Sequence, residues 1–502
     1  MKFIVYSHIG ESAIRDNLGQ PEYSYHFVLK GYQLALAELG SVELVQNPQT
    51  EVDPIFASCT ARGEDCVFLS FAPPHKTSAD LECPTVPVIA WEFSTIPNEA
   101  LDDDPRSDWR FVLAKAGRAI TLSSYTEQAI KGVMGSEFQV RSIAVPVVKR
   151  LAPAVKTART AGADAELTIR GAILDSSTMS LSADLLAMPS RPPESRAAAP
   201  KAGAGELIRQ HRSGVAVFSA TGESLGVRWR CWIMSQVDRL REAGPAPLPD
   251  RSDAEAQATG QGRVKVGGVV YTSVLNPMDG RKNWADMVSA FCWAFRDTED
   301  ATLVLKMVHK DLAPYWGSLG LLLCRLSPFK CRVLTLHGYL EDEEYETLIE
   351  ATTYYVNTSN CEGLCLPLME FMVGGKPAIA PKHTAMMDYI DESVAFVVRS
   401  GLETNVWPQD PLHRFRTMRY RLDWESLLEC FQQSYRIAKT GPEEYSAMAM
   451  RAKRRMQDYC SVATIKDQLR SFFEQSFDFN PVPTDKQRAS AVAPACLGQE
   501  DK

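Results

Sequence analysis

Hydrophobic and polar positions along residues 1–150 alternate between short apolar runs and longer amphipathic segments. The short runs Lys2–Tyr6 and Cys66–Phe71 predict buried strands. The apolar spacing of Ser24–Leu39 and Ser124–Val133 predicts helices. Buried strands that alternate with helices are typical of a parallel sheet with helical crossovers, so the loops after the strands form the expected ligand-binding edge. Further strands are predicted at Val86–Trp91, Ala119–Ser123 and Gln139–Val145.

Residues 151–262 break this alternation. Arg191–Gly205 and Gly244–Gly262 are rich in Ala, Pro and Gly, and they flank a better-patterned island at Gly214–Leu240. Flanks of this composition are typical of linkers. The glycines of Ala202–Gly205 do not follow a strand, which argues against a dinucleotide-binding turn. The segment is interpreted as an insertion or elaborated linker that is partly disordered.

The alternation resumes at Val264, and few large apolar residues remain after Asn480, which predicts a disordered tail. The sequence therefore predicts an α/β protein with two Rossmann-like lobes, an interlobe cleft and an inserted low-complexity segment. The predicted strands of the second lobe are Val269–Ser273, Thr302–Val308, Arg332–Leu336, Tyr354–Asn357, Pro377–Ala380 and Phe396–Val398. The predicted helices are Trp284–Phe295, Asp342–Ala351, Pro367–Val373, Asp423–Ala438, Pro442–Cys460 and Thr464–Gln475. The predicted division is an N-terminal lobe at 1–150, the insertion at 151–262, a C-terminal lobe at 263–462, a helix at 463–479 that packs back on the N-terminal lobe, and the tail at 480–502.

The composition is that of an ordinary soluble protein. Of the 502 residues, 45% are hydrophobic and 23% charged, and the formal net charge is −8, which argues against a nucleic-acid binder that works through a basic face. The twelve cysteines lack zinc-site spacing, and Asp102-Asp103-Asp104 is more typical of a solvated loop than of a metal site, so no metal is expected. No apolar run reaches the roughly 18 residues of a membrane span. The first apolar run is too short for a signal peptide, and a cytoplasmic enzyme is expected.

The run from Asn360 to Glu370 carries the clearest chemical signal. It begins just after the predicted strand Tyr354–Asn357 and passes through Gly363 into a helix. The start of that helix presents free backbone N–H groups and the positive end of the helix dipole, which together suit a phosphate. The carboxylates Glu362 and Glu370 stand on either side of this position and suit hydroxyl groups of a ribose and a sugar.

This pattern, followed by Gly375-Lys-Pro-Ala-Ile-Ala and a downstream acidic helix, resembles the retaining glycosyltransferases of family 4, which have the GT-B fold. The resemblance implies that Glu370 holds the ribose hydroxyls of a nucleotide and that Glu362 lies beside the donor sugar. It also implies that the backbone of Gly363, Leu364 and Cys365 approaches the sugar and phosphates. The family often has a small residue at the position of Cys365. The resemblance covers roughly residues 265–400 closely and 1–150 loosely.

A second block, Tyr271–Trp284, follows a predicted strand and places Arg281 and Lys282 at the start of a helix. A cation at a helix N-terminus opposes the helix dipole, so two cations there suggest an anion between them. The resemblance implies that this basic pair binds the donor diphosphate and neutralises the leaving group.

A third block, His337-Gly-Tyr-Leu340, matches the glycine turn that lines the base pocket in the family. Tyr339 and Leu340 are therefore candidate base contacts. Lys306 lies near the end of an apolar strand and is a weaker candidate for a side chain that points into the cleft.

The N-terminal lobe is expected to bind the acceptor. Gly10 follows the first strand, where the family has a loop near the donor phosphates, and His8 lies in the same loop. Glu92 follows the third predicted strand, in an area where family members often have a histidine. Glu92 and His8 are the candidates on the acceptor side.

The function predicted from these features is transfer of a sugar from a nucleoside diphosphate sugar to a hydroxyl acceptor with retention. The expected partners are the nucleotide sugar as co-substrate and a glycan or lipid-linked acceptor, without nucleic acid and without a tightly bound cofactor. A role in polysaccharide or glycolipid assembly leaves room for peripheral contact with the inner face of a membrane. The alternatives are a sugar-nucleotide epimerase, a phosphorylase of the same form, and a scaffold protein with a degenerate transferase fold.

Overall fold

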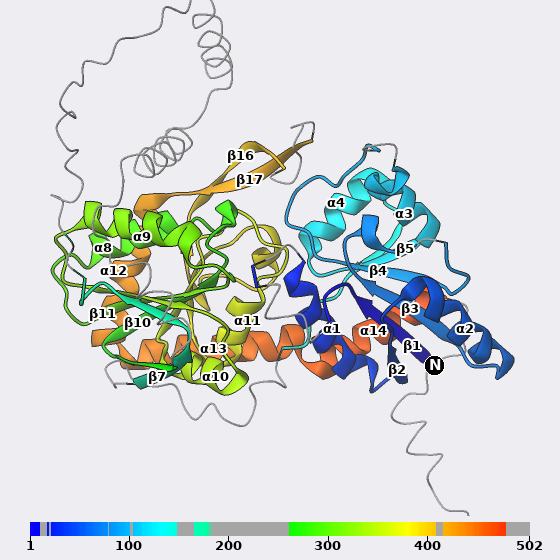
Figure 1. The fold of residues 1–502 in the computed structure, drawn as a ribbon, viewed down its shortest axis with the longest axis horizontal. Helices are drawn as coiled ribbons and strands as arrows, with labels where there is room; N and C mark the ends of the chain where they lie inside the picture. The colour runs from blue at the N-terminus through cyan, green and yellow to red at the C-terminus, as the bar shows by residue number, and fades with distance from the viewer. Residues whose placement is uncertain are drawn as a thin grey trace, which may run out of the picture.

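The computed structural model describes most of the chain in two α/β lobes that lie side by side (Figure 1). The predicted island at 214–240 and the predicted tail at 480–502 lie outside the described residues. The structure describes residues 1–10, 18–19, 22–78, 80–100, 104–147, 165–179, 181, 261–407 and 415–477.

The N-terminal lobe is built on a six-stranded sheet in which every pair of neighbouring strands is parallel. The strand order is β2-β1-β3-β4-β5-β6. The chain adds β2 on one side of β1 and all later strands on the other side, so the switch point of this sheet lies between β1 and β3. Every residue of β3 is buried, as expected for a parallel sheet covered on both faces. The strands are β1 (Lys2–Ser7), β2 (Ser41–Leu44), β3 (Cys66–Phe71), β4 (Thr85–Ile89), β5 (Arg118–Thr121) and β6 (Gln139–Ser142), and the helices are α1 (Tyr23–Leu36), α2 (Pro48–Ala61), α3 (Trp109–Ala116) and α4 (Ser124–Met134).

The C-terminal lobe is built on a seven-stranded sheet of order β15-β14-β13-β10-β11-β12-β8. All neighbours are parallel except β8, which runs antiparallel to β12 at the edge. The strands are β8 (Ala172–Asp175), β10 (Val269–Leu275), β11 (Ala301–Met307), β12 (Arg332–His337), β13 (Tyr354–Val356), β14 (Ala378–Pro381) and β15 (Ala395–Val398). The helices are α8 (Trp284–Ala294), α9 (Ala313–Leu326), α10 (Asp342–Ala351), α11 (Leu366–Val373), α12 (Trp424–Thr440) and α13 (Pro442–Cys460). The predicted α/β architecture with two Rossmann-like lobes is therefore confirmed.

Part of the segment interpreted as a linker belongs to the second lobe. Strand β7 (Ala165–Arg170) pairs antiparallel with β9 (Gln261–Val266), and β8 joins the edge of the seven-stranded sheet. Arg332 on β12 holds β8 through Asp175, with a closest N–O distance of 2.5 Å. Short runs of alternating polarity inside a low-complexity segment carry little sequence signal, which is why these strands were not predicted. The exact domain limits stay a prediction.

A hairpin extends from the C-terminal lobe toward the N-terminal lobe (Figure 1). It consists of β16 (Ser400–Val406) and β17 (Arg416–Leu422), which pair antiparallel along their whole length. This hairpin was not predicted because both of its faces carry polar residues, so no apolar alternation marks the strands in the sequence.

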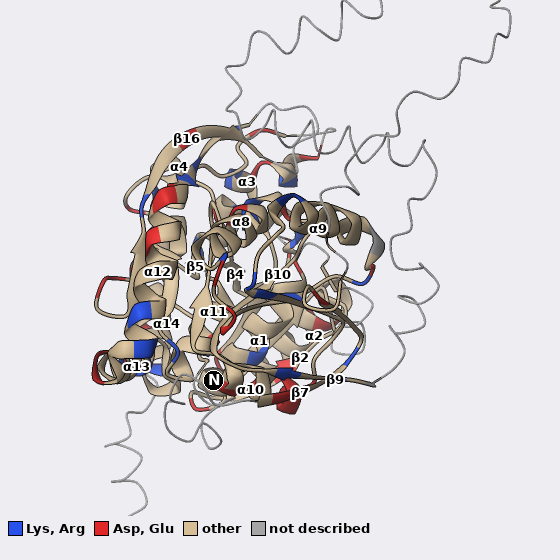
Figure 2. Cartoon of the chain, turned by 90° about the vertical axis from the view of Figure 1, so that its left-hand side faces the viewer, with Lys and Arg blue, Asp and Glu red and all other residues tan. Residues whose placement is uncertain are grey.

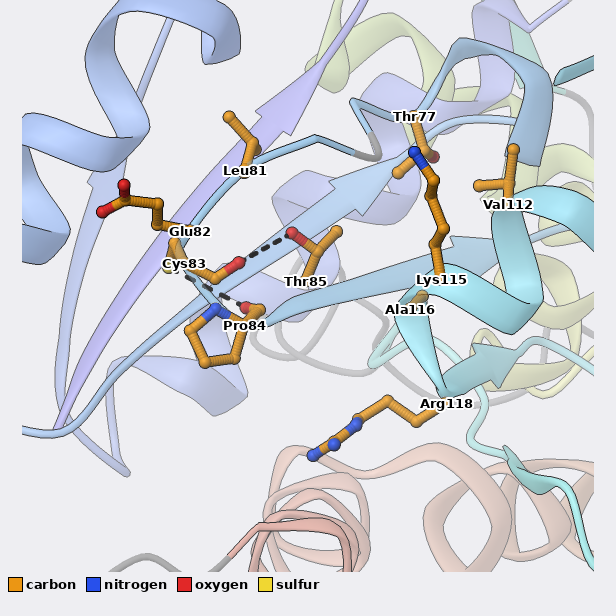
Figure 3. Close-up of a pocket in the computed structure, with 10 residues that line it drawn as sticks. All are labelled: Thr77, Leu81, Glu82, Cys83, Pro84, Thr85, Val112, Lys115, Ala116 and Arg118. Carbon is orange, nitrogen blue, oxygen red and sulfur yellow. Dashed lines mark hydrogen bonds between the residues drawn. The ribbon is translucent and has the colours of Figure 1, made fainter.

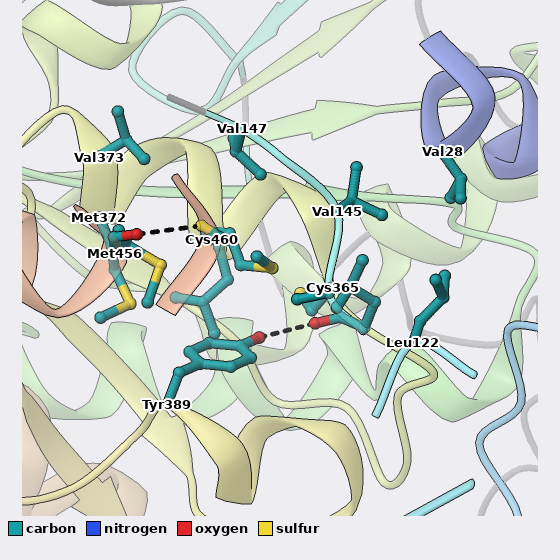
Figure 4. Packing of buried hydrophobic residues seen from close by; sticks show 14 of the residues in the cluster. Val28, Leu122, Val145, Val147, Cys365, Met372, Val373, Tyr389, Met456 and Cys460 are labelled. Carbon is teal, nitrogen blue, oxygen red and sulfur yellow. Dashed lines mark hydrogen bonds between the residues drawn. The ribbon is translucent and has the colours of Figure 1, made fainter. Parts of the chain in front are cut away.

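The two lobes share one continuous apolar core. Figure 4 shows Val28, Leu122 and Val145 of the first lobe packed near Cys365 and Tyr389 of the second. The last helix, α14 (Val462–Ser476), follows the C-terminal lobe but packs on the first, where the ring of Phe473 lies 5.2 Å from that of Phe3. Charged residues of both signs are interspersed over the surface helices seen in Figure 2.

Candidate active site

The candidate site lies where the second sheet changes direction. From β10 the chain proceeds outward through β11 and β12, and it then returns to the other side of β10 as β13 and proceeds through β14 and β15. Ligands of open α/β sheets bind in the crevice at the carboxyl ends of the strands on either side of such a switch point. The loop after β10 contains Arg281 and Lys282, and the loop after β13 contains Glu362. The topology thus brings together the two blocks that the sequence analysis singled out.

Glu362 is the centre of this site. Its side chain is buried, and its carboxylate lies 2.6 Å from Lys282 Nζ and 3.1 Å from an amino nitrogen of Arg281. The hydroxyl of Ser359 donates to the same carboxylate at 2.6 Å, and the side-chain amide of Asn357 donates at 3.3 Å. Burial alone would raise the pKa of Glu362, but the charges of Lys282 and Arg281 outweigh it and hold the pKa at about 2. Glu362 is therefore a carboxylate at any working pH.

The two cations are held at the end of a short turn. Asp279 caps this turn by accepting from the backbone N–H of Arg281, and its carboxylate also lies 2.8 Å from Arg281 Nε. The anion that the sequence analysis expected between Arg281 and Lys282 is, in this structure, the carboxylate of Glu362. The backbone also joins the two loops, because Asn360 N–H donates to the carbonyl of Arg281 at 2.7 Å.

The N-terminal lobe contributes Glu92 to the same cluster. Its carboxylate lies 3.3 Å from Arg281 Nε. Burial raises the pKa of Glu92, and the charge of Arg281 opposes that rise only in part. Strand β4 ends at Ile89, earlier than the predicted limit at Trp91, so Glu92 stands on a loop that reaches the other lobe. The guanidinium of Arg281 therefore binds carboxylates of both lobes: Glu92 of the first, and Asp279 and Glu362 of the second.

Gly363 lets the two lobes approach this closely. A Cβ atom at this position would lie 3.1 Å from the backbone nitrogen of Trp91 and 3.4 Å from its carbonyl carbon. The neighbouring backbone cannot easily yield, so a side chain here would push the two loops apart. Gly363 thus serves contact between the lobes, and its predicted role toward the sugar stays a prediction.

Thr384 contacts the backbone of Glu362 and has a strained backbone conformation. Its φ angle is +50°, which a β-branched residue rarely adopts. Its hydroxyl accepts from the backbone N–H of Glu362 at 3.0 Å, and Ala385 N–H donates to the Glu362 carbonyl at 3.2 Å. Such strain persists where surrounding contacts fix it, and it often marks functional sites.

Helix α11 begins directly after Cys365, whose φ angle of +66° favours the small residue that the family often has there. Burial raises the pKa of the Cys365 thiol to about 12, so the side chain is neutral. Further along the helix, Glu370 is buried and its carboxylate accepts from the Tyr345 hydroxyl at 2.7 Å. The carbonyl of Leu364 accepts from Tyr389 at 2.7 Å, which fixes the turn that precedes the helix.

The remaining candidates are less closely joined to the cluster. His8 is exposed and its ring nitrogen lies 3.4 Å from the Tyr6 hydroxyl, while Gly10 faces open space. Leu340 is buried in the shared core and Tyr339 is half-buried. Lys306 is buried and donates to the carbonyl of Gly338 at 2.5 Å; burial lowers the pKa of Lys306 to about 7. Their functional roles stay predictions.

Several supporting residues were not predicted from the sequence. Their signal was weak because Ser, Thr and Asn after a strand are common in ordinary turns. A run of polar residues directly after a buried strand at the switch point would have been the available clue. The missed residues are Asn357, Ser359, Asp279, Thr384 and His383.

Two cavities of the described residues lie away from this cluster. One of about 210 Å³ opens beside Thr85, Lys115 and Arg118, at the amino ends of β4 and β5 (Figure 3). Another of about 340 Å³ lies between β7 and α10. The first is at the sheet edge opposite to the one that binds ligands in this kind of fold.

The described residues contain neither a candidate metal-binding cluster nor a candidate membrane-spanning helix. Among them, no group of three or more His, Cys, Asp or Glu side chains is placed to hold a metal ion. Within the same residues, no helix combines the length and apolar character needed to cross a membrane.

Comparisons with known proteins give structural neighbours alone. No family model matches the chain, and no curated protein matches it. HepE of Anabaena, solved with UDP and glucose, is 12% identical, with 95% of this chain and 100% of that chain covered and a TM-score of 0.48. Sucrose-phosphate synthase of Thermosynechococcus elongatus is 14% identical, with 95% and 99% covered and a TM-score of 0.49. A glycosyltransferase of Rickettsia africae is 9% identical, with 95% and 99% covered and a TM-score of 0.46.

Proposed function

We propose that this chain transfers a sugar from a nucleoside diphosphate sugar to a hydroxyl acceptor, with retention at the anomeric carbon. The observation that carries the proposal is the convergence of Lys282, Arg281 and Glu362 at the switch point of the second sheet. Two cations on one side of a buried carboxylate suit a substrate that joins a diphosphate to a sugar. The resemblance to family 4 glycosyltransferases includes these residues together with Gly363 and Glu370.

The two cations serve the departing diphosphate. When the bond between the anomeric carbon and the phosphate oxygen breaks, negative charge grows on that oxygen, and fixed cations nearby lower the barrier. In the proposed complex Lys282 and Arg281 share their charge between the diphosphate and Glu362. The carboxylate of Glu362 is ionised, so it accepts hydrogen bonds from sugar hydroxyls and stabilises positive charge at the anomeric carbon.

The other groups position the two substrates. Glu370, held by Tyr345, accepts from the ribose hydroxyls of the nucleotide. Glu92 approaches from the N-terminal lobe and holds the acceptor hydroxyl on the face from which the diphosphate leaves. A new bond then forms between the acceptor oxygen and the anomeric carbon, and the proton of the acceptor hydroxyl passes to a phosphate oxygen of the leaving group.

A screen of nucleotide sugars tests the proposal. The purified protein is incubated with UDP-, GDP-, ADP- and dTDP-sugars, and release of the nucleoside diphosphate is measured with and without simple glycan and lipid-linked acceptors. Release from one donor, with α-linked product from an α-linked donor, supports the proposal. Binding of no nucleotide sugar would instead favour the scaffold alternative, and a visible cofactor spectrum would favour a phosphorylase.

A further inference from the structure

His383 lies behind the turn that presents Glu362. It follows β14 and is 2% exposed. Its Nε2 atom lies 2.9 Å from the carbonyl oxygen of Ser359, and its Nδ1 atom lies 3.0 Å from the hydroxyl of Ser400. A carbonyl oxygen can only accept, so Nε2 carries the hydrogen and Nδ1 accepts from Ser400. Burial lowers the pKa of His383 to about 4, which keeps the ring neutral at physiological pH.

The same imidazole packs against the base of the β16–β17 hairpin. The ring of Tyr420 stacks on it, with centroids 4.4 Å apart and an interplanar angle of 24°. The backbone N–H of Tyr420 donates to the carbonyl of Asn360 at 2.9 Å. Ser359 and Asn360 are neighbours in the chain, so the histidine and the hairpin hold one turn through two consecutive carbonyls.

This turn fixes the carboxylate of Glu362. The hydroxyl of Ser359 donates to the carboxylate at 2.6 Å, on the same oxygen that binds Lys282. A shift of Ser359 would therefore change the direction in which Glu362 points and its distance from Lys282. Asn357 is the other neutral side chain that donates to this oxygen, and its distance of 3.3 Å makes it the weaker support.

The hairpin also reaches the opposite lobe. The backbone N–H of Met418, on strand β17, donates to the Ser94 hydroxyl of the N-terminal lobe at 3.1 Å. The hydroxyl of Thr95 donates to the carbonyl of Arg416 at 2.9 Å. Ser94 and Thr95 follow Glu92 by two and three positions. The hairpin thus contacts the loop that presents Glu362 and the loop that presents Glu92.

We propose that His383 is a positioning residue, which orients Glu362 by holding the carbonyl of Ser359 against the base of the β16–β17 hairpin. The effect on turnover rests on the proposed function, whereas the effect on the orientation of Glu362 does not. His383 itself touches neither substrate in this proposal. It acts through Ser359 on Glu362.

Crystal structures of two variants test the orientation directly. In His383→Ala the Ser359 carbonyl loses its donor, and the Glu362 carboxylate is expected to move away from Ser359 and Lys282. In His383→Gln the side-chain amide can replace the Nε2 donor, and the carboxylate is expected to keep its place. An unmoved Glu362 in His383→Ala would overturn the proposal, whatever the enzyme does.

Kinetics supply the second test. His383→Ala is expected to lower kcat about 30-fold, because a small misplacement of a reacting group is costly, while the donor KM changes less than about 3-fold. His383→Gln is expected to recover most of the loss. If the histidine acts through Glu362, adding His383→Ala to Glu362→Gln costs nothing further. Additive losses in the double variant would contradict the proposal.

A control variant removes the half-buried imidazole of His75 instead. His75 lies in the N-terminal lobe and accepts from Trp109 Nε1 at 3.3 Å. His75→Ala is expected to retain the kcat of the unsubstituted protein. Should the unsubstituted protein transfer sugar from no nucleotide donor, the proposed function fails, and the crystallographic comparison still decides the role of His383.

Discussion

Both lobes are built on a mainly parallel sheet, but they differ in the charged residues that lie at the carboxyl ends of the strands. In the second lobe the switch point between β10 and β13 presents Arg281, Lys282 and Glu362. In the first lobe the switch point lies between β1 and β3, where Lys76 pairs with Glu22 at 2.7 Å, outside the cluster around Glu362. The charged residue of that lobe in the site, Glu92, follows β4 instead. The second lobe thus builds a fixed, charged site, and the first approaches it with one carboxylate.

Aromatic packing marks the surface where the first lobe meets the second. The ring of Trp91 lies 4.9 Å from that of Trp407, and Phe93 packs against the same indole at 6.4 Å. Apolar contacts of this kind place the Glu92 loop without adding charge. A site divided in this way predicts that changes in the second lobe affect departure of the nucleotide, whereas changes in the first affect transfer to the acceptor.

The largest expected effect is that of Lys282→Ala. Loss of the cation nearest Glu362 removes charge stabilisation of the leaving diphosphate, and kcat is expected to fall about 1000-fold. Turnover is measured with the donor found in the screen. Lys382→Ala is the control, because Lys382 is an exposed lysine of the same lobe. If Lys282→Ala is about as active as the control, Lys282 does not stabilise the leaving diphosphate.

Glu370→Ala tests the proposed contact with the ribose of the nucleotide. Loss of the carboxylate that accepts from ribose hydroxyls is expected to weaken donor binding about 100-fold, since the partner hydroxyls stay unpaired. Tyr345→Phe removes one hydrogen bond to Glu370 and is expected to weaken binding about 5-fold. Calorimetric titration with the donor measures both. Equal donor affinity in all three proteins would exclude Glu370 from the nucleotide site.

Glu92→Gln tests the difference between the lobes. Transfer is expected to slow about 30-fold, because loss of the hydrogen bond between the acceptor hydroxyl and a charged carboxylate costs about 2 kcal/mol. Donor affinity and slow donor hydrolysis are expected to change little. A pH profile adds a second readout: burial raises the pKa of Glu92, so the acidic limb of kcat/KM should lie above pH 4.5 and disappear in the variant. A loss confined to donor binding would place Glu92 with the second lobe instead.

The smallest expected effect concerns stability against acid. The pKa of Glu362 is about 2 in the folded protein, below its ordinary value of 4.5. The stabilisation from its ionised form is therefore complete above pH 4.5 and is lost as the pH falls toward 2. Glu362→Gln should flatten this part of the unfolding midpoint profile and slow transfer. Asp391, paired with Arg455, has a pKa of about 2 as well, and Asp391→Asn should flatten the profile and spare transfer.

Much of the second lobe could be predicted from the sequence because periodicity and chemistry agree there. The limits of α10 and α13 match the predicted helices, and Lys282 and Glu362 follow strands with strongly apolar runs. Lys282 and Glu362 lie close together because β10 and β13 are neighbours in the sheet, and this strand order cannot be read from a single sequence. Glu92 was selected for its place after a strand, and the structure brings it to Arg281.

The rest escaped prediction for physical reasons. Strands β7, β8 and β9 are short and flank a low-complexity segment, and the β16–β17 hairpin exposes polar side chains on both faces. His383 follows β14 outside any recognised motif, and its importance arises from contacts with Ser359 and Tyr420. Such contacts between distant segments leave no periodic pattern in the sequence.

Titration of the protein with its donor nucleotide sugar tests the central claim most directly. The claim is that Lys282 and its partners at the switch point of the second sheet bind the donor diphosphate. Calorimetry is expected to give saturable binding of one nucleotide sugar by the unsubstituted protein and by Lys382→Ala, and binding at least about 10-fold weaker by Lys282→Ala. Equal affinity in the three proteins, or binding of no nucleotide sugar by any of them, would contradict the claim.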